Sequence, residues 1–74
     1  MAADWEQMMG GEFQAHAAQA GCCRLSVIGG GNAWHWFVRC DRHGDVEGRG
    51  GALDAAKVTA EDVARGLARD AGTA

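Results

Sequence analysis

Three cysteines, three histidines and scattered acidic side chains are the residues of this chain with the chemistry for catalysis or metal binding. Cys22, with His35 or His43 and with Asp41, supplies the residue types of nucleophilic catalysis. No local motif orders these residues, and a small exposed sheet offers no pocket that excludes water. We therefore expect no catalytic residue, and we expect that the chain is not an enzyme.

The sequence contains one of the two closely spaced ligand pairs that are typical of a zinc site. Cys40 and His43 have a separation that is common among zinc ligands, and Cys22, Cys23 and His16 are further residues of the right type. A strong zinc signature needs two such closely spaced pairs, and the sequence has one. We therefore expect no bound metal ion and no other cofactor.

Length and charge restrict the class of protein. The 74 residues correspond to one small domain, 1–74, with a net charge of -3. That charge disfavours general nucleic-acid binding, which needs an excess of Lys and Arg. No apolar run reaches the roughly 20 residues of a membrane span, and Asp4 and Glu6 occupy the place of a positive signal-peptide region. We expect a cytoplasmic protein of a bacterial host cell, with reduced cysteines.

The segment 34–40 holds three of the five aromatic residues. Strand alternation divides it into two faces. One face carries Trp34, Trp36, Val38 and Cys40, which are typical of a core. The other carries His35, Phe37 and Arg39, and a solvent face rarely places an aromatic ring between a histidine and an arginine.

Polarity predicts how the strand at 22–28 pairs with this aromatic strand. Pairing Val27 with Trp36 also pairs Leu25 with Val38, so that all four share the core face. The same register pairs Cys23 with Cys40, close enough for a disulfide. In a reducing compartment, however, two small free core residues are favoured at these positions.

A third strand is predicted from about Asp45 to Leu53, after a loop at Arg42-His43-Gly44. Pairing Trp36 with Gly50 places a large ring over a glycine, which has no side chain to pack, and it sets Trp34 over Ala52 and Val38 over Gly48. Arg39 then lies across from Glu47.

Two helices complete the predicted fold. Trp5, Met9, Phe13, Ala17 and Ala20 recur at helical spacing, with an interruption at Gly10-Gly11. A second helix begins with Thr59 as its N-cap, and residues 54–57 form either a separate turn or an extra helical turn. Its sheet-facing residues are Val63, Ala64, Leu67, Ala68 and Ala71. The predicted class is α+β, in the order αβββα, with both helices on one face of a three-stranded antiparallel sheet.

The sheet face opposite the helices is the candidate binding surface. It carries five residues that folding alone does not explain: Arg24, His35, Phe37, Arg39 and Arg49. Arg24 opposite Arg39 is a like-charge pair, which destabilises a sheet unless an acidic partner neutralises it. An ordinary solvated face with one stray phenylalanine is the alternative interpretation.

The predicted element order resembles that of the double-stranded-RNA-binding domain. Gly48-Arg49-Gly50, then Ala56-Lys57 and Ala60, are similar to the end of that family's sequence pattern. The resemblance covers about a third of the chain and implies the fold and a nucleic-acid surface. Leu53 and Asp54 stand where the family carries lysines, which argues against contacts to RNA.

Size, acidity and composition together resemble the small phage-encoded anti-CRISPR proteins. These share no motif, so the resemblance is to a class profile and carries over no residue. It implies a phage or prophage inhibitor that blocks a nucleic-acid-binding surface of a CRISPR effector complex. We therefore expect a non-enzymatic protein-binding module. The alternatives are a nucleic-acid-binding module that uses the three arginines and Phe37, and a homodimer that buries the Phe37 face.

Overall fold

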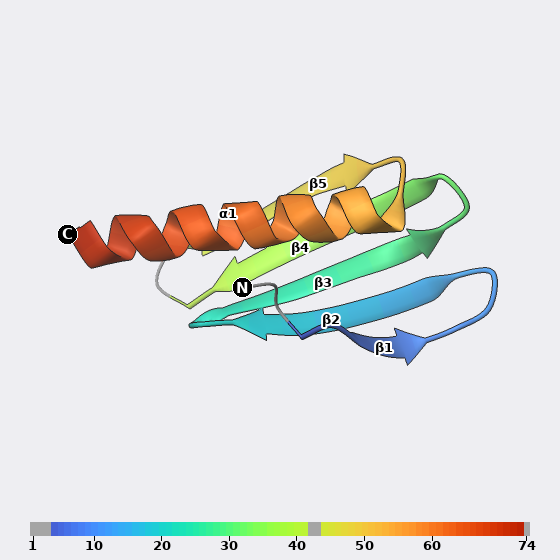
Figure 1. The fold of residues 1–74 in the computed structure, drawn as a ribbon, viewed down its shortest axis with the longest axis horizontal. Helices are drawn as coiled ribbons and strands as arrows, with labels where there is room; N and C mark the ends of the chain where they lie inside the picture. The colour runs from blue at the N-terminus through green and yellow to red at the C-terminus, as the bar shows by residue number, and fades with distance from the viewer. Residues whose placement is uncertain (1–3, 42–43, 74) are drawn as a thin grey trace.

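The computed structural model describes residues 4–41 and 44–73 of the chain, which form five antiparallel strands and one helix (Figure 1). The strands follow one another across a single sheet in sequence order. The elements are β1 (Glu6–Met9), β2 (Gln14–Ala20), β3 (Cys23–Gly30), β4 (Ala33–Cys40), β5 (Gly44–Gly50) and α1 (Leu53–Thr73).

The molecule has two layers. Helix α1 returns from β5 and lies along one face of the sheet, above β3 and β4 (Figure 1). Small helix residues allow this close approach, because Ala56, Ala60 and Ala64 are all buried against the sheet. The strands contribute the rest of the core: Cys23, Leu25, Val27, Trp34, Trp36, Val38 and Cys40. No described element covers the opposite face, which we call the open face.

The predicted αβββα order is wrong, because the first part of the chain forms β1 and β2 in place of a helix. Gly11 has a positive φ of 106° in the turn between the two strands, so the glycine pair reverses the chain. The alanines of β2 favour helix intrinsically, but pairing along the whole length of β3 outweighs that preference. His16, Ala18 and Ala20 then face the core side of the sheet, opposite Val27, Leu25 and Cys23.

The predicted register of β3 and β4 is confirmed. Val27 lies opposite Trp36, Leu25 opposite Val38, and Cys23 opposite Cys40. A slip of one residue would move polar Arg24 and Ser26 under the helix, and burial of that face excludes it.

The predicted register of β4 and β5 is wrong by two residues. Trp36 lies opposite Gly48, not Gly50, and Trp34 lies opposite Gly50, not Ala52. A two-residue slip keeps every side chain on its face, so alternation cannot detect it. A tryptophan ring nevertheless packs over a glycine, as predicted, because a Cβ on Gly48 would come within 3.0 Å of three atoms of the Trp36 ring. Val46, not Gly48, faces Val38.

The helix begins at Leu53, earlier than an N-cap at Thr59 predicts, so the alternative of an extra turn at 54–57 is correct. The Thr59 hydroxyl donates to the Ala55 carbonyl oxygen at 2.9 Å, a bond that hydroxyl residues make inside helices. Ala64 is buried as predicted, and Val63 and Leu67 are partly buried. The side chains of Ala68 and Ala71 lie outside the described residues. Within the described ranges, no helix is both long and apolar enough to span a membrane.

Candidate functional site

The structure brings the five predicted binding residues together on the open face. Cross-strand partners share a face, so the pairings define three parallel rows. The rows are Ile28–His35–Arg49, Ser26–Phe37–Glu47 and Arg24–Arg39–Asp45. Phe37 lies in the middle row, and the three arginines lie in the outer rows.

Strands β1 and β2 extend these rows on the side opposite to β5, which the sequence did not predict because it assigned that segment to a helix. They add Met9 and Ala15 beside Ile28, Glu6 and Ala17 beside Ser26, and Gln19 beside Arg24. The alternation that places them on this face is hard to recognise from sequence, since alanines occupy both faces of β2. The open face is therefore a five-stranded surface and not a three-stranded one.

Strand β4 carries a stack of two rings on the open face. His35 and Phe37 lie two residues apart on β4, and their ring centroids are 4.5 Å apart at an interplanar angle of 21°. Both side chains are half-buried by their neighbours, although nothing in the described structure covers them from above. His35 Nε2 also lies 3.9 Å from Glu47 Oε1, so protonation of the imidazole would create an ion pair.

The charged end of the open face contains the predicted like-charge pair, with Arg24 directly opposite Arg39. Asp45 on β5 pairs with Arg39, with Nε and Oδ1 3.4 Å apart, whereas the sequence predicts Glu47 for this role. Both of those side chains are mostly exposed, so the pair is worth at most about 1 kcal/mol. Among the described residues Arg24 has no ion pair, so a positive charge remains available at this end.

Exposed apolar side chains gather at the opposite end of the face. Ile28 is 47% exposed and Met9 is 58% exposed, and both flank Ala15 in the same row. A shallow hollow opens beside them, where Ile28, His35 and Arg49 meet the glycine pair Gly50-Gly51 at the end of β5. Apolar and charged contacts are thus available at opposite ends of one surface.

A buried histidine lies on the covered face, the sheet face that packs against α1. His16 is 7% exposed, and its Nε2 lies 2.9 Å from Gln14 Oε1. Burial lowers the pKa of His16 below its ordinary value of 6.5, and the positive charge of Lys57 on α1 lowers it further. His16 is therefore neutral in the folded state near pH 7 and does not act as a cation on the binding surface.

Trp5, which directly precedes β1, contacts helix α1. Its indole Nε1 donates to Glu61 Oε2 at 3.3 Å, and Lys57 Nζ lies 5.5 Å from the ring centroid. The helical spacing in the sequence did place Trp5 toward the core, but in the wrong element. Its contacts have a structural explanation, so we do not assign it to the site.

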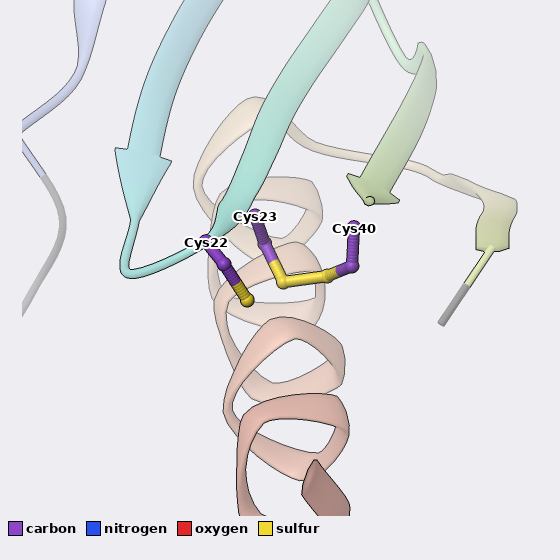
Figure 2. Close-up of side chains that lie close together, drawn as sticks. All are labelled: Cys22, Cys23 and Cys40. Atoms are coloured by element: carbon purple, nitrogen blue, oxygen red, sulfur yellow. A yellow bond between two sulfur atoms is a disulfide. The ribbon is translucent and has the colours of Figure 1, made fainter. Parts of the chain in front are cut away.

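The three cysteines lie close together at the end of the sheet where β3 begins and β4 ends. Cys23 and Cys40 form a disulfide, the alternative that the sequence disfavoured, and Cys22 is free and exposed (Figure 2). The three sulfur atoms all lie within 4.8 Å of one another. His43, a predicted ligand candidate, lies outside the described residues, and His16 does not belong to this cluster.

Comparison with models of protein families, with curated protein sequences and with solved structures found no significant match to this chain. The resemblances to anti-CRISPR proteins and to the double-stranded-RNA-binding domain both stay predictions.

Proposed function

We propose that this chain is a protein-binding module and that its partner docks on the open face. The observation that carries the proposal is the stacked His35–Phe37 pair on β4, on a sheet face that no described element covers. An aromatic ring on an uncovered surface is a frequent anchor of protein interfaces, where burial against a partner removes its apolar area from water.

The arrangement around this stack supports a partner with an acidic segment. Arg24 and Arg39 lie opposite each other, and Asp45 neutralises only Arg39. A carboxylate of the partner placed near Arg24 would relieve the repulsion that folding leaves in place. Ile28 and Met9, at the other end, offer apolar contacts to the same partner.

The charge balance of the open face favours a protein over a nucleic acid. Its three arginines, Arg24, Arg39 and Arg49, are matched by three carboxylates, Glu6, Asp45 and Glu47. Phosphate binding needs a clear excess of positive charge, and the whole chain carries -3. The nucleic-acid alternative is therefore the weaker one.

The narrower role, a phage or prophage inhibitor of a CRISPR effector complex, is part of the same proposal. It is supported by the class profile of size and acidity, and a partner of that kind would be a protein surface that normally holds nucleic acid. The open face supplies the interaction surface that inhibition by occlusion needs. Its Arg24–Arg39 pair adds no support for this narrower role, because a surface that normally holds nucleic acid is itself basic.

The test is capture of a partner from bacterial lysate by tagged protein, with matched variants. We expect Phe37→Asp and Arg24→Glu to lose a partner that the wild type retains. Val58→Asp is the control, because Val58 is an exposed apolar residue of α1, away from the open face. A partner retained equally by all four proteins would overturn the proposal.

Two further measurements separate the alternatives. A mass in light scattering that doubles with concentration, and that returns to the monomer in Phe37→Asp, would replace the partner with a second copy of the chain. Binding to duplex RNA or DNA that weakens as salt increases would favour the nucleic-acid module. We expect a monomer and no such binding.

A further inference from the structure

A second group of reactive side chains is the cysteine cluster, which lies away from the His35–Phe37 stack on the open face. Cys23 begins β3, Cys40 ends β4, and Cys22 occupies the turn before β3 (Figure 2). The two bonded cysteines are almost completely buried, with exposures of 0% and 1%, whereas Cys22 is exposed. The cluster therefore has a buried side under the helix and one side open to solvent.

The turn explains why a third sulfur is present. Ala20 pairs with Cys23, so Gly21 and Cys22 alone connect β2 to β3. Gly21 has a φ of 61°, the left-handed conformation that a tight turn of this kind requires. Cys22 thus leaves the strict alternation of the strand, and its sulfur comes within 4.8 Å of both bonded sulfurs.

We propose that the reduced form of this cluster binds a thiophilic cation of the Zn²⁺ class through the thiolates of Cys22, Cys23 and Cys40. The Cys23–Cys40 disulfide is the oxidised form, which cannot bind. The site thus acts as a redox-dependent metal site, a property that is independent of partner binding at the open face.

The distances support three ligands on one ion. A zinc–sulfur bond of about 2.3 Å places tetrahedral sulfur ligands about 3.8 Å apart. Three sulfurs already within 4.8 Å of one another need movements of about 1 Å to reach this spacing. Cleavage of the disulfide lets its two sulfurs move apart, and the exposed Cys22 side chain has room to approach them. Water or an external ligand would complete a tetrahedron.

The change of state has a defined balance. A dithiol reductant transfers two electrons and two protons to the Cys23–Cys40 disulfide, which yields two protein thiols and the disulfide of the reductant. Coordination then releases the protons of the three thiols, because thiolates are the ligands. Acid is therefore expected to weaken binding. An external disulfide is expected to expel the ion, because thiol–disulfide exchange re-forms the Cys23–Cys40 bond while the external disulfide takes up the two electrons and leaves as two thiolates.

The experiment uses the full chain, reduced with a phosphine under anaerobic conditions and titrated with Cd²⁺ as the probe. We expect one ion per chain, a thiolate-to-cadmium charge-transfer band in the ultraviolet, and displacement by Zn²⁺. The Cys22→Ser variant should bind at least about 100-fold more weakly. It keeps both core cysteines, so its circular dichroism and unfolding curve should match the wild type.

Two comparisons make the result decisive. His16→Gln removes a potential ligand outside the cluster and should bind as the wild type does, and disulfide-bonded wild type should show no charge-transfer band. Equal affinities in reduced wild type and Cys22→Ser would overturn the proposal. A stoichiometry of one ion per two chains would also overturn it, since the site would then lie between molecules.

Discussion

The two faces of this sheet are built from the same strands but differ in what explains their residues. On the covered face, Trp34, Trp36 and Val38 are buried beneath α1, and each has a packing role. On the open face, the alternate residues of the same strand, His35, Phe37 and Arg39, have no covering element in the described structure. Folding thus accounts for the residues of the covered face, whereas those of the open face have no packing partner above them in the described structure.

The largest difference between the faces should appear in stability. Trp36→Ala removes a large buried side chain and should cost about 3–5 kcal/mol of unfolding free energy, enough to unfold much of a domain of this size. Phe37→Ala, one residue along on the open face, should cost about 1 kcal/mol or less. Urea denaturation followed by circular dichroism measures both, and equal losses would break the distinction between the faces.

A second prediction concerns the glycine beneath Trp36. Gly48→Ala introduces a methyl group that overlaps the ring, and overpacking of this kind should cost about 1–3 kcal/mol. Gly66→Ala is the matched control, because that helical position has open space around it. There the same substitution should stabilise by about 0.5–1 kcal/mol. Thermal unfolding that shifts in the same direction for both variants would refute the proposed packing.

His16 predicts a pH dependence of stability. The pKa of His16 is lowered in the folded state, so below its ordinary value of 6.5 the unfolded chain binds more protons than the folded one. Its contribution is complete above pH 6.5 and is lost as pH falls from there toward the folded pKa. Unfolding titrations at pH 7 and pH 5 should show a smaller decrease in His16→Gln than in wild type.

An equal loss of stability in the wild type and in His16→Gln between pH 7 and pH 5 would contradict the assignment of this effect to His16.

The smallest expected change in stability concerns the like-charge pair on the open face. Arg24→Glu replaces a like-charge pair with an opposite-charge pair across from Arg39, which should stabilise by about 0.2–1 kcal/mol. The same variant should lose the partner. A residue whose replacement improves folding and abolishes binding is retained for binding, so a loss of stability in denaturant titrations would remove this support.

The strand register was predicted correctly where one face of each strand is buried and the other is exposed. The pairing of Val27 with Trp36 and of Leu25 with Val38 followed from polarity, because a one-residue slip would bury Arg24. The β4–β5 register failed because a slip of two residues preserves polarity, and only the fit of the Trp36 ring over Gly48 distinguishes the two registers.

The helix predicted over residues 5–20 was wrong for a different physical reason. Alanines on both faces of β2 leave almost no alternation, and apolar residues at helical spacing are compatible with a helix. Pairing with β3, a long-range interaction, decides the outcome. The five predicted open-face residues nonetheless fall on one surface, because β3, β4 and β5 determine it. The third sulfur of the cysteine cluster depends on the turn at Gly21, which was not recognised in the sequence.

The most direct test of the central claim is hydroxyl-radical footprinting of the chain with and without its captured partner, read by mass spectrometry. Oxidation of Phe37 and Ile28 on the open face should fall when the partner binds, while oxidation of Val58 on α1 should be unchanged. Protection of Val58, with Phe37 and Ile28 as reactive as in the free protein, would contradict the central claim.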